Sequence, residues 1–182
     1  MNSDAEKIID FWFVKHNRDH WFGISEQFDS ELRENFFDLY KKVAAGEADH
    51  WRTTPLGRLA EIVVLDQFSR QFFRGKSAAF ACDRMALVLA QHLVATGGDK
   101  SLTQEQALFA YLPYMHSESL VIHKEAVRLF EQLGNENNLL FEIEHRDVLA
   151  RFGRFPKRNK ALGRTSTDEE LAYIAERDGS HF

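Results

Sequence analysis

The chain has 182 residues, of which 44% are hydrophobic and 28% are charged, and its net charge is −5. This length suits a single domain, residues 1–182, that needs no disulfide or metal to stabilise its core. The one cysteine, Cys82, excludes an intramolecular disulfide, and no apolar run approaches the roughly 18 residues of a membrane span, so we expect a cytoplasmic protein without a membrane segment.

Apolar residues spaced three and four apart predict helices along nearly the whole chain. In chain order, the predicted helices follow Ser3, run from Ser25 to Gly46, start at Thr54-Pro55, run from Ser77 to Gly97, run from Thr103 to Pro113, and span residues 118–134, 137–152 and 166–177. Capping boxes mark three of these starts, formed by Ser3 with Glu6, Thr103 with Gln106, and Ser166 with Glu169. Because Pro113 lacks an N–H, we expect it to disrupt its helix.

The predicted fold class is all-α, with about eight helices in antiparallel pairs. No segment alternates polar and apolar residues for long enough to form a convincing strand. No tetratricopeptide consensus recurs at a period of about 34 residues, so the sequence itself does not reveal a repeat array.

The positive charge is concentrated in residues 151–164. Six of the 23 basic residues lie there without an acidic one, so the rest of the chain holds 17 basic against 28 acidic residues. A nucleic-acid-binding protein spreads positive charge over a whole face, which this chain does not do, so we expect no nucleic-acid partner. A short basic segment on an acidic body indicates a site for a small anion, an acidic peptide end or an internal carboxylate, or else a solvated charge run.

Residues 65–75, "LDQFSRQFFRG", hold a first group of candidate side chains. Asp66 and Arg70 are four residues apart and share a helix face, which Arg74 joins if the helix continues. The simplest interpretation is a helical ion pair with Gly75 ending the helix.

Residues 111–119, "YLPYMHSES", hold a second group. Ser117 or Ser119 suits the start of the next helix, and Glu118 suits its positive end. Capping does not explain His116, which is either a hydrogen-bonded structural residue or a catalytic one.

Residues 144–159, "EHRDVLARFGRFPKRN", hold a third group. His145 points with the apolar face, Asp147 and Arg151 form an expected i,i+4 pair, and Arg154 aims with Arg151 if the helix persists. Arg158 and Asn159 follow in a loop. An arginine buried among phenylalanine rings needs a partner, because an unpaired buried charge is strongly unfavourable. That partner is an internal carboxylate, Asp66 or Glu118, or an anionic ligand.

These stretches, together with "AAGEADHW..TP.G.LA.IVVLDQFSR..FRG...AFA.D", resemble the bacterial domain-of-unknown-function 924 family over about residues 8–174. The resemblance implies an all-helical, right-handed superhelical fold like that of tetratricopeptide proteins, and it brings no established activity. The family's motif positions fall on Asp66, Gln67, Arg70, Phe73, Arg74, Gly75, His116, Ser117, Glu118, His145, Arg151, Gly153, Arg154, Pro156, Arg158, Asn159, Gly163 and Arg164. The family usually has Pro where Ser69 stands and His where Lys157 stands, so Lys157 is not expected to act as a base or metal ligand.

Three functions remain open. In the first, the protein binds a small anion or an acidic peptide end, and its candidate ligand-binding residues are Asp66, Arg70, Arg74, Tyr111, His116, Arg151, Arg154, Arg158 and Asn159. In the second, it is an enzyme in which His116 and His145 act as acid and base and Glu118 or Asp66 orients one of them. In the third, the charged motifs form a structural network without a ligand.

Metal binding is not predicted. Glu142 with His145 and Glu47 with His50 have the Glu-x-x-His spacing of di-iron helical proteins, but no further pair of bridging carboxylates is evident. The sequence names no cofactor and no oligomeric state. For either function that needs a ligand, we expect the segments around Arg70, His116 and Arg154 to converge in space.

Overall fold

The computed structural model describes residues 3–177, and all regular structure in that range is helical. The α-helices are α1 (Ser3–Asp10), α2 (Arg18–Phe22), α3 (Glu26–Ala44), α4 (Pro55–Val63), α5 (Ser69–Phe72), α6 (Asp83–Ala95), α7 (Gln104–Met115), α8 (Leu120–Leu133), α9 (Glu136–Phe152) and α10 (Asp168–Glu176). Short π-helical segments span Phe11–Lys15 and Val64–Phe68, and 3₁₀ turns span Asp49–Thr53, Ser77–Phe80, Gly98–Ser101 and Pro156–Arg158. The predicted all-α class is confirmed.

Local signals placed several helix starts correctly. The side chain of Ser25 accepts a hydrogen bond from the backbone of Phe28, and Thr54 caps α4 with Pro55 at the first helical position. Thr103 and Gln106 form the predicted capping box. The last box was predicted one residue too early, because Thr167 with Glu170 makes it in α10.

Other boundaries differ from the prediction because packing outweighs local preference. α7 continues through Pro113 to Met115, since every residue from Ala107 to Met115 is buried. Ser77 opens a 3₁₀ turn rather than the following helix. Ser119, one of the two residues expected at the start of α8, is its N-cap residue, but its side chain makes no capping hydrogen bond.

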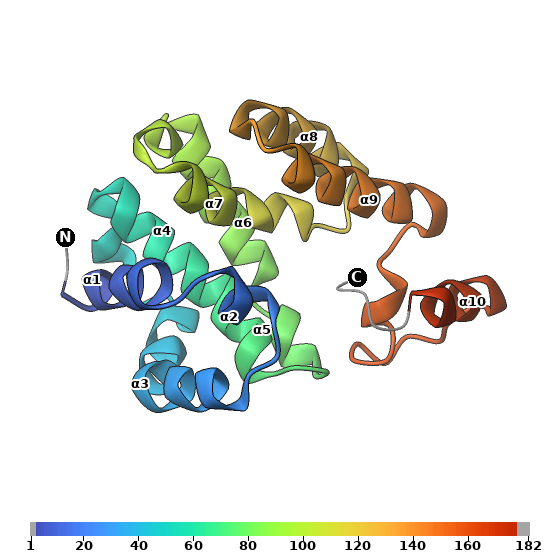
Figure 1. The fold of residues 1–182 in the computed structure, drawn as a ribbon, viewed down its shortest axis with the longest axis horizontal. Coiled ribbons are helices and arrows are strands. Elements are labelled where there is room, and N and C mark those ends of the chain that lie inside the picture. The colour runs from blue at the N-terminus through green and yellow to red at the C-terminus, as the bar shows by residue number, and fades with distance from the viewer. Residues whose placement is uncertain (1–2, 178–182) are drawn as a thin grey trace.

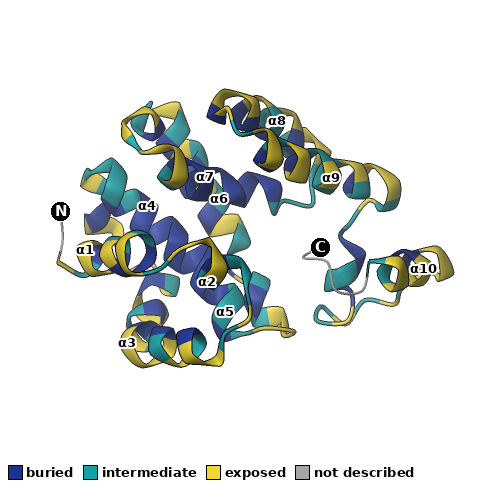
Figure 2. Cartoon of the chain, viewed as in Figure 1, coloured by how far each residue is buried: buried dark blue, intermediate teal, exposed yellow. Residues whose placement is uncertain are grey.

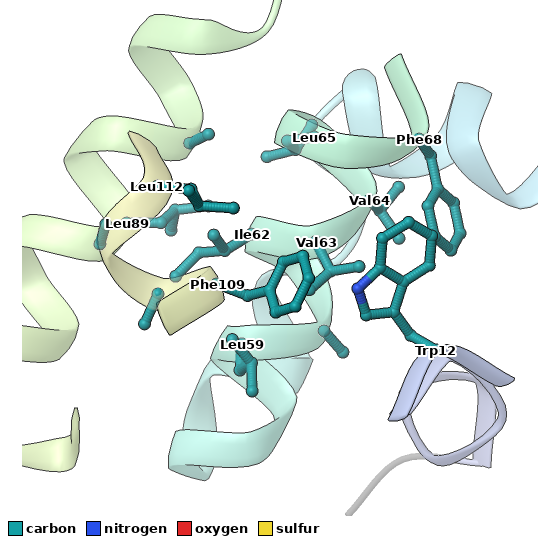
Figure 3. Packing of buried hydrophobic residues seen from close by; sticks show 14 of the residues in the cluster. Trp12, Leu59, Ile62, Val63, Val64, Leu65, Phe68, Leu89, Phe109 and Leu112 are labelled. Atoms are coloured by element: carbon teal, nitrogen blue, oxygen red, sulfur yellow. The ribbon is translucent and has the colours of Figure 1, made fainter. Parts of the chain in front are cut away.

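The centre of the molecule is α4. It packs against α1 on one side and against α6 and α7 on the other (Figure 1), and its buried colour contrasts with the exposed outer face of α3 (Figure 2). Trp12, Phe68 and Phe109 surround Val63 and Val64 (Figure 3). The ring centroid of Trp12 lies 5.4 Å from that of Phe68 and 5.7 Å from that of Phe109, so aromatic pairs join the N-terminal helices to the core.

Beyond α4, the helices pack in chain order, α6 on α7, α7 on α8 and α8 on α9. This order is compatible with a tetratricopeptide-like superhelix, which stays a prediction. The stretch Ser77–Ala95 is long and apolar enough to cross a membrane by length and composition alone, with 33% of its apolar window buried. Core helices meet the same criterion, and α6 packs on α4 and α7.

Candidate functional site

The site begins at the π-helical segment Val64–Phe68, where the carboxylate of Asp66 is fully buried. Isolated π-turns frequently occur at functional sites. The predicted pair with Arg70 is present, with 3.1 Å between Arg70 Nη1 and Asp66 Oδ1. Arg70 also donates two hydrogen bonds to Asp83 on α6, at 2.9 and 3.1 Å. The guanidinium is therefore held between two carboxylates.

His116 follows the end of α7 and makes a direct contact with Asp66. Its Nδ1 lies 2.8 Å from Asp66 Oδ1. Burial raises the pKa of Asp66, but the charge of Arg70 and the hydrogen-bonded His116 outweigh it, so the pKa lies below its ordinary value. An ionised carboxylate only accepts hydrogen bonds, so His116 Nδ1 carries a proton and donates the hydrogen bond to Asp66.

This arrangement fixes the chemical state of the imidazole. Burial lowers the pKa of His116, and the charge of Arg70 lowers it further, while the charge of Asp66 acts in the opposite direction and is outweighed. His116 is therefore neutral near pH 7, and its second nitrogen, Nε2, is a proton acceptor. A carboxylate and a neutral imidazole in this order are suited to general-base chemistry.

Arg158 reaches the same cluster from the 3₁₀ turn Pro156–Arg158. Its guanidinium carbon lies 4.8 Å from the ring centroid of Phe80 and 4.6 Å from that of Phe155. It donates a hydrogen bond to the His116 carbonyl at 3.0 Å and a longer one to Asp83 at 3.3 Å. Burial, followed by the charge of Arg70, lowers the pKa of Arg158 to about 10. The buried guanidinium of Arg158 thus shares its paired carboxylate, Asp83, with Arg70.

A cavity of about 450 Å³ opens beside these groups, and we call it the first cavity. Its lining includes Arg70, Arg158, His116, His145 and the ring of Phe80. His145 Nδ1 lies 2.7 Å from the Phe141 carbonyl and donates to it. Burial holds the pKa of His145 well below its ordinary value, so this ring too is neutral near pH 7. The first cavity therefore combines the guanidinium groups of Arg70, Arg74 and Arg158 with two neutral imidazoles.

Comparisons with known proteins identify the family of this chain. A family model described as "Bacterial protein of unknown function (DUF924)" matches residues 8–178. The chain belongs to this family. A solved structure titled "Structure of Protein of Unknown Function ATU0120 from Agrobacterium tumefaciens" is similar, with 36% identity, a TM-score of 0.91, and coverage of 96% of this chain and 98% of that one. No curated protein matches the chain.

In this DUF924 member, Asp66, Arg70, His116 and Arg158 come together from three distant segments, whereas Arg154, which was expected to converge with Arg70 and His116, pairs with Glu170 instead. Arg74 lines the first cavity as well, and its guanidinium also pairs with Asp29 at 3.0 Å.

Glu118 does not contact either predicted catalytic histidine. It accepts two hydrogen bonds from Arg164, at 2.8 and 2.6 Å, and one from the Phe155 backbone at 2.8 Å. Burial raises the pKa of Glu118, but the hydrogen bond from Arg164 and other contacts outweigh it and lower the pKa. Its function is to attach the C-terminal segment to the α7–α8 junction, and Asp66 is the residue that orients His116.

Four other candidates lie outside the lining of the first cavity. Arg154 donates two hydrogen bonds to Glu170 on α10, and Asn159 contacts the same carboxylate at 3.2 Å. Arg151 pairs with Glu169, so the predicted i,i+4 pair is wrong, because Asp147 pairs with Arg146 instead. Tyr111 donates to Asp99 at 2.7 Å, away from the cluster. The first three of these side chains hold α10 in place.

The break in α9 explains why arginines only a few residues apart have different partners. Gly153 adopts a left-handed conformation with φ of 70° and ends the helix at Phe152. Arg151, Arg154 and Arg158 consequently do not follow a single helical face.

Asp83 was missed by the sequence reasoning, although it is the pairing partner of both Arg70 and Arg158. Its position in the "AFA.D" motif and at the first turn of α6 was the available signal. Among the described residues, no group of three or more His, Cys, Asp and Glu side chains is arranged to hold a metal ion. Glu142, considered above as a possible ligand, instead contacts His123 at 2.6 Å.

Proposed function

We propose that this protein binds a small anionic ligand in the first cavity, between Arg70 and Arg158. The observation that carries the proposal is the buried guanidinium of Arg158. Its side chain is 14% exposed, and the carboxylate of Asp83 that neutralises it already receives two hydrogen bonds from Arg70. A further anion would stabilise both cations, since charge-assisted hydrogen bonds to guanidinium are strong in a partly dehydrated site.

The surroundings of Arg158 also support a ligand rather than a purely structural role. Two other arginines of the same C-terminal stretch each have a carboxylate of their own, Arg154 in Glu170 and Arg164 in Glu118. Arg158 instead donates to a carbonyl and stacks between two rings at the cavity wall. Aromatic stacking orients the planar guanidinium, which favours recognition of a planar carboxylate or of two phosphate oxygens.

The first experiment is isothermal titration of the wild type with inorganic phosphate, sulfate, acetate and succinate. We expect at least one of these anions to bind. At 100 times its dissociation constant it should add about 2.7 kcal/mol to the free energy of unfolding, which is roughly 5–10 °C in melting temperature at this chain length. Arg158→Met should abolish the effect, and Arg151→Met is the matched control because its side chain pairs with Glu169 at the surface. Binding that survives in Arg158→Met would contradict the proposal.

A second candidate function is acid–base catalysis on the bound anion, and the Asp66–His116 contact favours it. Asp66 fixes the proton on Nδ1 of His116, which makes Nε2 the base on a ring that lines the cavity. Such a base contributes typically 10²–10⁴-fold to a rate.

The test is a panel of phosphate and carboxylate esters, assayed with the wild type and His116→Asn. We expect a turnover that is lost in His116→Asn but kept in His50→Asn, where the exposed His50 lies beside Asp49. If the two variants lose activity equally, or if no ester is turned over, the catalytic proposal is wrong while the binding proposal still stands.

A further inference from the structure

A second cavity, of about 510 Å³, also borders the arginine–histidine cluster. Its walls come from α2, α5, α7 and α9, and they are largely apolar. Trp21 and Phe22 contribute from α2, and Leu108, Leu112 and Met115 contribute from α7. The α2 helix is held over this space by a hydrogen bond from the Gln71 side chain to the Trp21 carbonyl, at 3.2 Å.

The two cavities share part of their lining. Arg70, Arg74, His116 and His145 border both of them. A molecule whose charged end lies on the guanidinium groups therefore has a partly apolar space next to it, bordered by the same four side chains.

Two amide side chains in the lining of the second cavity have polar atoms without a protein partner in residues 3–177. Asn138, on α9, is 6% exposed, and its side chain makes no hydrogen bond within residues 3–177. Gln67 donates through Nε2 to Asp66 at 2.6 Å, and its Oε1 has no partner in the same range. Amide atoms that border a cavity and have no protein partner are free to hydrogen-bond a ligand group or water there.

We propose that the second cavity binds the apolar body of the same anion, so that the ligand is an amphipathic organic acid with an alkyl or aryl body and a hydrogen-bonding group for Asn138. This inference rests on the anion binding proposed above. A single inorganic ion would leave both the apolar walls and Asn138 without a partner. The volume is that of a site for an organic molecule rather than an ion, since such sites span roughly 300–1,000 Å³ and are mostly apolar with few polar groups.

The experiment is isothermal titration with matched ligands of increasing apolar length. The probes are propanoate and hexanoate, propyl and hexyl phosphate, and the neutral hexanamide. Each buried methylene should raise the affinity about fourfold, or about 60-fold from propanoate to hexanoate. We expect the same gain in affinity from propyl phosphate to hexyl phosphate. The tighter binder of hexanoate and hexyl phosphate would then identify the preferred charged group. A gain below about fivefold in both series, or hexanamide binding as tightly as hexanoate, overturns the inference.

Substitutions in the lining test whether the apolar body of the ligand lies in the second cavity. Leu112 and Leu108 border this cavity but not the first one. Leu112→Trp should remove the gain from propanoate to hexanoate while it leaves the affinity for propanoate unchanged within about twofold. Propanoate binding also shows that Leu112→Trp is folded. If Leu112→Trp does not fold, Leu108→Trp replaces it in the experiment. A chain-length gain that persists in the folded variant puts the apolar body elsewhere and overturns the inference.

The role of Asn138 is tested with 5- and 6-hydroxyhexanoate. At least one of them should bind the wild type as tightly as hexanoate and lose about fivefold or more in Asn138→Leu, the value of one hydrogen bond. Equal losses for hexanoate and its hydroxylated forms would overturn the part assigned to Asn138.

Failure of this inference is distinguishable from failure of the proposed function. If propanoate or phosphate binds and a longer chain adds nothing, only the amphipathic ligand is excluded. If no anion in the series binds, the anion site itself is wrong and the inference is overturned with it.

Discussion

Replacing Arg158 by methionine should leave the protein at least as stable as the wild type while it removes anion binding. Methionine keeps an unbranched apolar stem between the rings of Phe80 and Phe155. It removes the guanidinium, the charge that the fold neutralises least well. An arginine that stabilises the fold would give the opposite result.

The magnitude follows from the contacts of Arg158. Burial and the charge of Arg70 lower its pKa from its ordinary value to about 10. A cation with a lowered pKa destabilises the folded state at every pH below that pKa, here by roughly 3 kcal/mol. The variant loses a hydrogen bond to His116 worth about 1 kcal/mol and ring contacts worth about 1 kcal/mol. The free energy of unfolding should therefore rise by about 1 kcal/mol.

Chemical denaturation at pH 7 with a fixed two-state analysis measures this difference. Arg151→Met is the control, because it removes an exposed charge from the same segment and should change the free energy of unfolding by less than about 0.5 kcal/mol. A loss of more than about 1 kcal/mol in Arg158→Met would refute the reasoning and identify Arg158 as part of a structural network.

Three further predictions concern the surrounding contacts. Arg154→Met should lower the melting temperature clearly without weakening anion binding, because it leaves the buried Glu170 carboxylate without its main partner; loss of binding at unchanged stability would contradict this. The free energy of unfolding should fall as the pH drops below about 6.5, because burial lowers the pKa of His145 and the unfolded chain then binds more protons. Chemical denaturation at pH 8 and pH 5.5 measures this fall, which should be smaller in His145→Gln. His123→Leu should cost about 3 kcal/mol in chemical denaturation, because the fully buried Glu142 loses its 2.6 Å contact, and a change below about 1 kcal/mol would show that this carboxyl needs no partner.

Helix starts were predictable where a single short segment decides them. Ser25, Thr54 and Thr103 each satisfy a backbone N–H three residues ahead, so their effect needs no distant partner. The end of α7 was not predictable in this way. Pro113 weakens a helix locally, but its surroundings bury it on all sides, and that information lies in other parts of the chain.

The candidate site was predictable in its residue types and less so in its geometry. Asp66 and Arg70 meet because they are one helical turn apart, which spacing alone reveals. Arg154 and Arg158 look equivalent in the sequence, yet one contacts α10 and the other borders the first cavity. The different partners of these two arginines depend on the path of the chain after Gly153. The spacing of apolar residues does not predict this path, because Gly153 breaks the helix in a left-handed conformation.

The π-helical segment Val64–Phe68 sets the direction, around the helix axis, of the side chains that follow it in α5. A helix advances about 100° per residue, so the extra residue of a π-turn rotates the next side chains by that amount relative to a continuous α-helix. Deleting one residue there would turn Arg70 away from Asp83 and would also move Phe72 out of the core. The number of residues between Pro55 and Phe72 is thus set jointly by the core and by the charged cluster, and an insertion or deletion in this span disturbs both at once.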